Sequence, residues 1–269
     1  MDRRTLYAIA AVVVLAALFA IYEFLQSSPP APAIAQVKVT PQPRAATASA
    51  PTASQVIESP QTQPPLPQLA NSDDFVLTAL ADVLENPALM KIFNTDQLIH
   101  NIVATVDNLP QQSVTIKTPP FNPPTGRFLT SGTEGHLSIS PGNANRYTAY
   151  VTLAVYADAR KLVQLYVHLY PLFQQAYEEL GYPNDSFNDQ LNDTLDDLLN
   201  TPDIKDPIKL VQPKFFYVYA DPDVEALSIG QKIMLRLGRK NIVIVKGKLN
   251  EIKQELALHV NQLQTGKAN

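Results

Sequence analysis

Carboxylates recur at regular spacing in the segment "GYPNDSFNDQLNDTLDDLL", which covers residues 181–199. Asp185, Asp189, Asp193 and Asp197 follow one another at intervals of four residues. Grouped carboxylates can bind a cation or serve as a general acid and base. A helix–loop–helix calcium site, however, needs ligands at alternate positions, a central glycine and a closing glutamate, and this spacing supplies none of them. The pattern predicts an amphipathic surface helix, with aspartates facing solvent and Phe and Leu forming a second, apolar stripe.

The charges of this segment have a counterpart later in the chain. Residues 178–206 carry nine acidic residues and one basic residue, whereas residues 232–253 carry seven basic residues and one acidic residue. Repulsion within each run would be relieved if the two runs lay near each other, within one domain or between subunits. Two ordinary solvated faces are the alternative, because surface ion pairs contribute little individually.

Other catalytic chemistry finds little support in the sequence. The absence of cysteine excludes disulfides, thiolate zinc sites and cysteine nucleophiles. His100 follows Asp96 by four residues, which could begin a metal site, but no third ligand has a recognisable spacing. No serine lies in a nucleophile elbow, and only 9 glycines argue against a dinucleotide fold. We therefore expect no catalytic residue set, no metal and no cofactor, and the net charge of −4 argues against nucleic-acid binding.

The N-terminal part of the chain predicts a membrane anchor. Residues 6–25 are apolar except for Glu23, and about 20 such residues in a helix span a hydrocarbon core of ~30 Å. Arg3 and Arg4 precede this stretch, and no basic residue follows until Lys38. The positive-inside rule then places residues 1–5 in the cytoplasm and the rest across the inner membrane, in the periplasm. A cleaved signal peptide, with small residues at 33–36, is the alternative.

A disordered linker and one folded domain are expected to follow. Residues 26–71 contain ten prolines and no aromatic residue, a composition that cannot bury enough surface to order the chain. Fully extended, this linker would reach on the order of 140 Å. Residues 72–264 predict a single, compact, mainly α domain of roughly six or seven helices with a small antiparallel β element.

Helix and strand boundaries follow from capping and turn residues. Helices are expected to begin at Ser72 or Asp73, at Asn94 or Thr95, near Asn145, at Asp158, near Phe187, and over residues 223–238 and 240–263. Gly181 is expected to end the long helix from Asp158, and Pro171 to kink or divide it. Strands are expected in "SVTIK", "RFLTS" and "HLSIS", and residues 208–222 predict a strand or an extended segment.

Several stretches together resemble a known bacterial family. They are "IVATVDNLP", "PPTGRF", "SPGNANRYTAYV", "YPLFQQAYEELGYPNDSFNDQL", "PIKLVQPKFFYVYADPDVEALSIGQKIMLRLG" and "IKQEL". Over about residues 72–255 the chain is similar to the domain of unknown function 3014 family. The resemblance implies the layout of an N-terminal anchor, a Pro-rich tether and a soluble domain, and it carries no active-site residue.

The motifs suggest where a polar binding groove would lie. Its candidate residues are Arg127, Arg146, Tyr147, Asn188, Asp189, Gln231 and Lys232. The alternative is that these residues serve turns, caps and buried networks. The leading functional hypothesis is a non-catalytic envelope protein whose domain binds a protein or cell-wall partner. The others are an envelope enzyme that uses Asp189 with a Tyr or Arg on cell-wall polymer, and an oligomerising module driven by the acidic and basic helices.

Overall fold

The computed structural model describes residues 65–113, 119–133 and 135–259. From Leu66 onward these residues belong to one compact unit. The predicted anchor at residues 6–25, and the predicted linker as far as residue 64, lie outside the described residues. Among the helices that are described, none combines the length and apolarity required to cross a membrane.

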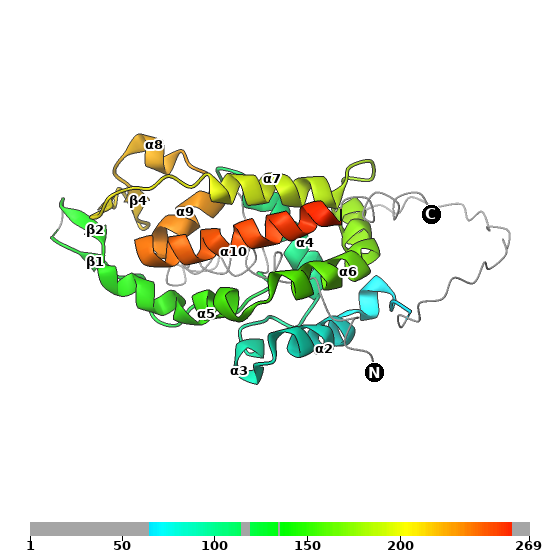
Figure 1. The fold of residues 1–269 in the computed structure, drawn as a ribbon. Coiled ribbons are helices and arrows are strands. Elements are labelled where there is room, and N and C mark those ends of the chain that lie inside the picture. The colour runs from blue at the N-terminus through cyan, green and yellow to red at the C-terminus, as the bar shows by residue number, and fades with distance from the viewer. Residues whose placement is uncertain (1–64, 114–118, 134, 260–269) are drawn as a thin grey trace, which may run out of the picture. The chain divides into compact units, whose positions relative to one another are not determined.

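The described residues are mainly α-helical and include one small antiparallel sheet (Figure 1). In chain order the elements are η1 (Leu69–Asn71), α2 (Asp73–Leu84), α3 (Pro87–Met90), α4 (Leu98–Asn108), β1 (Thr130–Ser131), β2 (Leu137–Ile139), η2 (Pro141–Tyr147), α5 (Thr148–Tyr156), α6 (Ala159–Leu180), α7 (Phe187–Leu199), β3 (Lys209–Val211), β4 (Val218–Tyr219), α8 (Pro222–Glu225), α9 (Ile229–Arg236) and α10 (Arg239–Leu258). The predicted class, mainly α with a small antiparallel β element, is confirmed.

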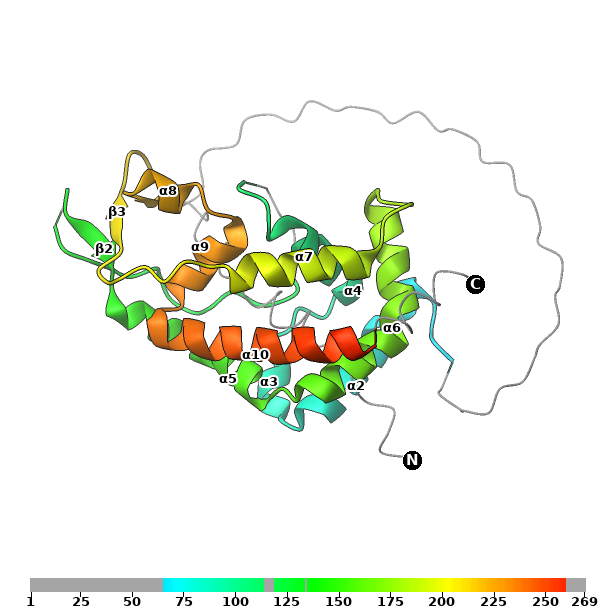
Figure 2. The ribbon, with the colours of Figure 1, turned by 45° about the horizontal axis from the view of Figure 1, so that its top comes forward.

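The core forms where the long helices pack together. The helix α6 packs against α4 and α10, and α7 packs against the same two helices (Figures 1 and 2). Phe173 of α6 and Phe187 of α7 stack with their ring centroids 5.6 Å apart. Leu191 and Leu195 of α7 are fully buried, so the apolar stripe predicted for the acidic helix is confirmed.

The ends of α6 follow the capping residues of the sequence. The carboxylate of Asp158 accepts a hydrogen bond from the backbone N of Lys161 at 2.9 Å, as an N-cap does. Gly181 ends the helix with φ of 123°, which a residue with a Cβ rarely adopts. Pro171 lies inside α6, which remains one helix and changes direction along its length (Figure 2).

The start of α4 differs from the sequence prediction. The helix begins at Leu98 rather than at Asn94 or Thr95, and Gln97 before it has φ of 50°. The carboxylate of Asp73, at the start of α2, accepts hydrogen bonds from the backbone N atoms of Gln97 and Leu98, both at 2.8 Å. The cap therefore comes from another helix, 24 and 25 residues earlier in the chain.

The folded part of the chain begins a few residues before Ser72. Leu69 is buried, and Leu66 packs against the same core. The hydroxyl of Ser72 donates a hydrogen bond to the carbonyl of Leu69 at 2.8 Å and makes no capping bond to α2. Ser72 nevertheless occupies the N-cap position and Asp73 is the first residue of α2, so the start that the sequence predicted for this helix is confirmed.

The sheet has the strand order β1-β2-β3-β4, and every pair is antiparallel. Leu137, Leu210 and Tyr219 lie opposite one another across three strands. Tyr219 and Leu210 are buried in a second apolar cluster with Val224 and Leu235, so one face of the sheet is covered by α8 and α9. The predicted strands in "RFLTS" and "HLSIS" are confirmed, and residues 208–222, predicted as one strand or an extended segment, form the two strands β3 and β4. Most of "SVTIK" lies outside the described residues.

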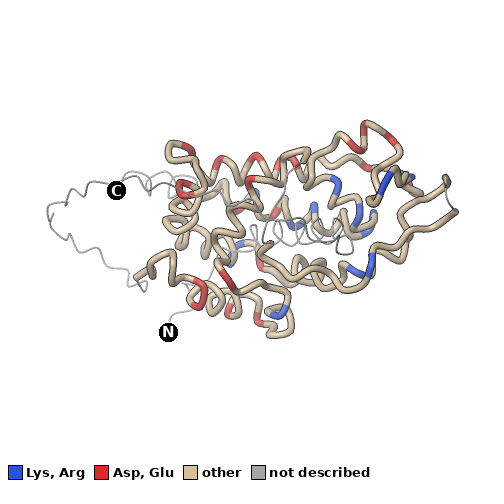
Figure 3. Tube along the Cα trace, turned by 180° about the vertical axis from the view of Figure 1, so that it is seen from behind, with Lys and Arg blue, Asp and Glu red and all other residues tan. Residues whose placement is uncertain are grey.

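The acidic and basic runs meet within the chain. Lys253 of α10 forms an ion pair with Asp196 of α7, and Arg239 forms one with Asp203 at 2.8 Å. Figure 3 shows Asp and Glu recurring along α7. Of the two alternatives left open by composition, the structure shows contact between the runs inside one domain, through ion pairs whose side chains are largely exposed.

Candidate functional site

The first turn of α9 is held by polar contacts to two other helices. The hydroxyl of Ser228 accepts from the backbone N of Gln231 at 3.0 Å and donates to the carboxylate of Asp197 at 2.6 Å. The side-chain amide of Gln231 donates to the carbonyl of Asp197 at 2.9 Å. The backbone N of Gly230 donates to the carbonyl of Leu109 at 2.9 Å. The candidate residue Gln231 thus joins the starting turn of α9 to the end of α7.

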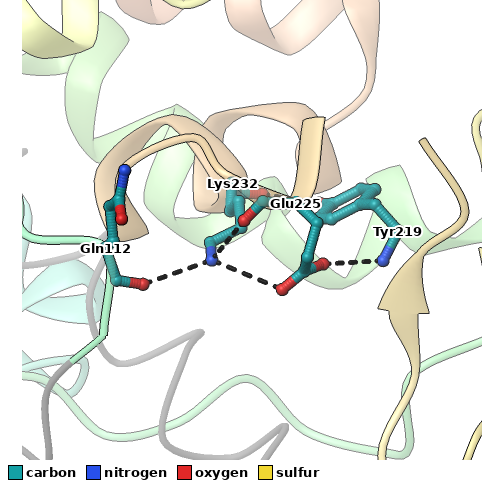
Figure 4. A network of polar contacts seen from close by, with 4 residues as sticks. All are labelled: Gln112, Tyr219, Glu225 and Lys232. Atoms are coloured by element: carbon teal, nitrogen blue, oxygen red, sulfur yellow. Dashed lines mark hydrogen bonds and ion pairs between the residues drawn. The ribbon is translucent and has the colours of Figure 1, made fainter. Parts of the chain in front are cut away.

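Lys232 lies at the centre of the adjoining network (Figure 4). Its ammonium donates to the carbonyls of Gln112 at 3.3 Å and Glu225 at 3.1 Å, and lies 3.5 Å from the Glu225 carboxylate. The other carboxylate oxygen of Glu225 accepts from the backbone N of Tyr219 at 2.7 Å. Two hydrogen bonds and one ion pair therefore surround the ammonium. Lys232 therefore joins β4, α8, α9 and the segment after α4, and its role is structural.

Asp197 departs from the predicted solvent-facing stripe. Asp185, Asp189 and Asp193 are exposed, but Asp197 is half-buried beneath Ser228. Burial raises the pKa of the Asp197 carboxyl, and the hydrogen bond from Ser228 partly opposes that shift. The two residues are 31 positions apart, so no local spacing could have indicated this pair.

Arg146 and Tyr147 hold the segment that precedes the sheet. The guanidinium of Arg146 donates to the carbonyls of Gly126 at 2.9 Å and Thr125 at 3.4 Å, and lies 5.5 Å from the ring centroid of Tyr147. Tyr147 is fully buried, and burial raises the pKa of its hydroxyl. Arg127 is exposed beside this turn. Arg146 and Tyr147 therefore fit the alternative in which the candidate residues stabilise turns and buried networks.

Asn188 and Asp189 lie in the first turn of α7, which Ser186 caps. The side chain of Gln174 on α6 accepts from the backbone N of Phe187 at 2.9 Å and donates to the carbonyl of Asp185 at 2.9 Å, which fixes the approach to α7. Asn188 is buried, and its side-chain oxygen has no hydrogen-bond partner among the described residues. Asp189 is exposed.

The seven candidate residues thus occur in three groups on different elements. In the described residues, Gln231 bonds to α7 and Lys232 pairs with α8. Arg146 bonds to the turn at residues 125–126, and Asp189 lies in the first turn of α7. The helix α10 packs against both α5, which follows Arg146 and Tyr147, and α7 (Figures 1 and 2). None of the seven lines either of the two hollows described below.

An open hollow lies where the α5–α6 corner meets the last turns of α10, and it has a volume of about 470 Å³. Tyr156, which lines it, is 63% exposed, and the neighbouring Val155 is 56% exposed. The lining residues are Val155, Tyr156, Ala157, Asp158, Ala159, Arg160, Lys248, Glu251, Gln254 and Glu255. The sequence motifs did not predict this hollow. The one local signal for it is the apolar and aromatic pair Val155 and Tyr156, two residues before the Asp158 cap.

A second hollow, of about 330 Å³, lies between residues 204–209 and 219–224 and is lined mainly by apolar side chains. Near the same sheet, the connection between β3 and β4 exposes large apolar residues. Phe215 is 81% exposed and Phe216 is 40% exposed, and Val211, the last residue of β3, is 43% exposed. Exposed apolar groups of this size are a common feature of interaction surfaces.

The described residues contain no group of three or more His, Cys, Asp or Glu that could hold a metal ion. His100 contacts Glu179 of α6 at 3.0 Å. The hydroxyl of Ser228 is committed to the Asp197 carboxylate and to the α9 cap, which explains its position without a nucleophilic role.

Comparison with known proteins identifies the family. Residues 98–253 match the family described as "Protein of unknown function (DUF3014)", and the chain belongs to this family. This match confirms the resemblance inferred from the sequence motifs. Neither the curated proteins nor the solved structures contain a match to the chain.

Proposed function

We propose that the protein is a single-pass inner-membrane protein whose periplasmic domain binds a protein or cell-wall partner without catalysing a reaction. The observation that carries this proposal is the hollow beside Tyr156. Lys232, Gln231 and Arg146 are occupied by internal bonds that hold the fold together. The hollow, in contrast, presents an exposed aromatic ring and several exposed polar side chains to solvent.

The anchor and the tether support the envelope location. Residues 6–25 have the length and apolarity of a span, and Arg3 and Arg4 favour a cytoplasmic N-terminus. Fusions of a periplasmic phosphatase and of a cytoplasmic reporter after residue 70 test this topology. We expect activity from the phosphatase fusion; activity from the cytoplasmic reporter alone would exclude the proposed location.

Site-specific photo-crosslinking in cells tests the binding. A photoreactive residue replaces Tyr156 or Glu251 in the full chain, and a matched control replaces Asp74, which is exposed on α2. We expect an envelope protein or cell-wall fragment, identified by mass spectrometry, from the hollow positions and not from Asp74. Capture of no envelope component from either hollow position would refute this binding site.

A further inference from the structure

We infer that the hollow beside Tyr156 binds a glycan strand, an extended polymer of sugar rings; this inference rests on the proposed envelope function. The hollow combines an exposed aromatic ring with hydrogen-bonding side chains of both donor and acceptor type. Sugar rings present apolar C–H faces together with hydroxyl groups that both donate and accept hydrogen bonds. The two sets of groups are complementary.

The fold fixes one wall of the hollow rigidly. The helix α5 ends at Tyr156, the backbone at Ala157 is extended, and the side chain of Asp158 caps α6. Ala157 and Ala159 are buried, so the corner is anchored in the core while Tyr156 remains 63% exposed. The backbone that carries Tyr156 is therefore anchored while most of the side chain remains exposed, and a Tyr ring offers a large contact area at a low cost in conformational entropy.

The opposite wall is the exposed face of α10 near its C-terminal end. Buried Leu249, Ile252 and Leu256 hold this helix to the core. Glu251 and Gln254 are exposed and line the hollow, and the Glu251 carboxylate accepts a hydrogen bond from the Lys248 ammonium on the same helix. A carboxylate accepts hydrogen bonds, and a side-chain amide both donates and accepts, which suits a row of sugar hydroxyls.

Charge also favours a polyhydroxyl ligand over an ion. Arg160 and Lys248 line the hollow together with Asp158, Glu251 and Glu255, so neither sign dominates. The guanidinium of Arg160 lies 3.9 Å from the carboxylate of Glu255, and its side chain is 71% exposed. This loose contact leaves Arg160 able to turn toward a ligand, because an exposed ion pair of this kind contributes little stability.

The form of the hollow favours a polymer over a small molecule. A pocket for a small ligand encloses most of the ligand's surface and is lined mainly by apolar side chains. This hollow is open and its wall is largely polar, so it can contact one side of a strand that continues beyond it. The surface at Phe215 and Phe216 instead presents two adjacent exposed phenylalanine side chains, which suits a protein partner better.

Co-sedimentation of the purified full chain with intact peptidoglycan sacculi tests the inference, with soluble glycan strands stripped of their peptides as competitors. Tyr156→Ala removes the ring, and Tyr156→Phe keeps the ring but removes the hydroxyl. Phe215→Ala is the matched control, since it removes another highly exposed aromatic side chain. We expect Tyr156→Ala to weaken binding at least about tenfold, as loss of a central aromatic contact does. Tyr156→Phe and Phe215→Ala should stay within about twofold of the wild type on the same scale.

The outcomes separate this inference from the proposed function. Competition by stripped strands, together with loss in Tyr156→Ala, supports the glycan site. Binding to sacculi that stripped strands do not compete, or that Tyr156→Ala leaves unchanged, overturns the glycan site and leaves envelope binding intact. If the wild type binds neither probe while crosslinking at Tyr156 captures an envelope protein, the ligand is a protein and the inference is wrong. If crosslinking also fails, the proposed function fails with it.

Discussion

The cap that Asp73 supplies to α4 gives a sharp test of the fold. Its two carboxylate oxygens accept from the backbone N atoms of Gln97 and Leu98, both at 2.8 Å. The first four N–H groups of a helix lack partners within the helix, and a negative charge is favourable at that end. Asp73→Ala removes both acceptors and the charge.

The expected loss follows from the exposure of each bond. The Gln97 bond is exposed, so water replaces it at a cost of about 0.5 kcal/mol, whereas the part-buried Leu98 bond to a charged acceptor is worth about 1.5 kcal/mol. Because it removes both hydrogen bonds, Asp73→Ala should lower the free energy of unfolding by about 2 kcal/mol. Asp73→Asn keeps one oxygen acceptor and should cost about 1 kcal/mol.

Asp74→Ala is the matched control. Asp73 and Asp74 both lie in the first turn of α2, but the side chain of Asp74 is exposed and caps no second helix. We expect Asp74→Ala to cost less than about 0.5 kcal/mol. Urea titration of the full chain measures these differences through tyrosine fluorescence, since the sequence contains no Trp. Equal losses in the Ala variants of Asp73 and Asp74, or a loss below about 0.5 kcal/mol in Asp73→Ala, would refute the long-range cap.

Three further predictions concern packing, charge and pH. Gly230→Ala should lower the free energy of unfolding by about 1–3 kcal/mol, because the added Cβ would lie 2.5 Å from a leucine of α7. Gly247→Ala, on the open face of α10, should instead raise it by about 0.5–1 kcal/mol. Equal effects of the two substitutions in urea titration would contradict the close approach at Gly230. Lys232→Met should lower the free energy of unfolding by about 2 kcal/mol, because it leaves the partly exposed carboxylate of Glu225 unpaired. Lys240→Met, at an exposed position, is the control and should leave the free energy of unfolding almost unchanged. Burial lowers the pKa of His168 below its usual 6.5, because the fold favours the neutral imidazole. The stability that this neutral side chain contributes is complete above pH 6.5 and is lost as the pH falls through the lowered pKa. Stability should therefore decline more steeply between pH 7.5 and 5.5 in the wild type than in His168→Gln, and parallel curves would show that His168 does not titrate in this way.

Local signals in the sequence predicted most of the helices. The Asp158 cap and Gly181 set the limits of α6, and the spacing of Phe187 and the leucines after it predicted α7 with its buried face. The stretch "NIVIV" has strand-like composition, but it forms part of α10 because the helix buries Val245 in the core and continues as an amphipathic pattern. Residues 223–238 divide into α8 and α9, since Ser228 caps the second helix.

Long-range contacts decided what these local signals could not. Capping of α4 by Asp73 and burial of Asp197 under Ser228 each join residues more than 20 positions apart, so no spacing rule applies to them. The candidate residues chosen from motifs were polar residues near turns. In the structure Arg146, Gln231 and Lys232 hold turns and helix ends together, because a buried polar group must find a partner within the fold.

The sequence by itself determined the helical class and the family, and it predicts an order of anchor, linker and domain. These features depend on local periodicity, caps and composition, which each segment carries within itself. Only the tertiary structure decided which polar side chains are bonded inside the fold and which remain exposed to solvent. Tyr156 and Gln254 lie almost 100 residues apart and line one hollow because α5, α6 and α10 pack on one core. That packing depends on the burial of apolar faces from distant segments, and no single segment specifies it.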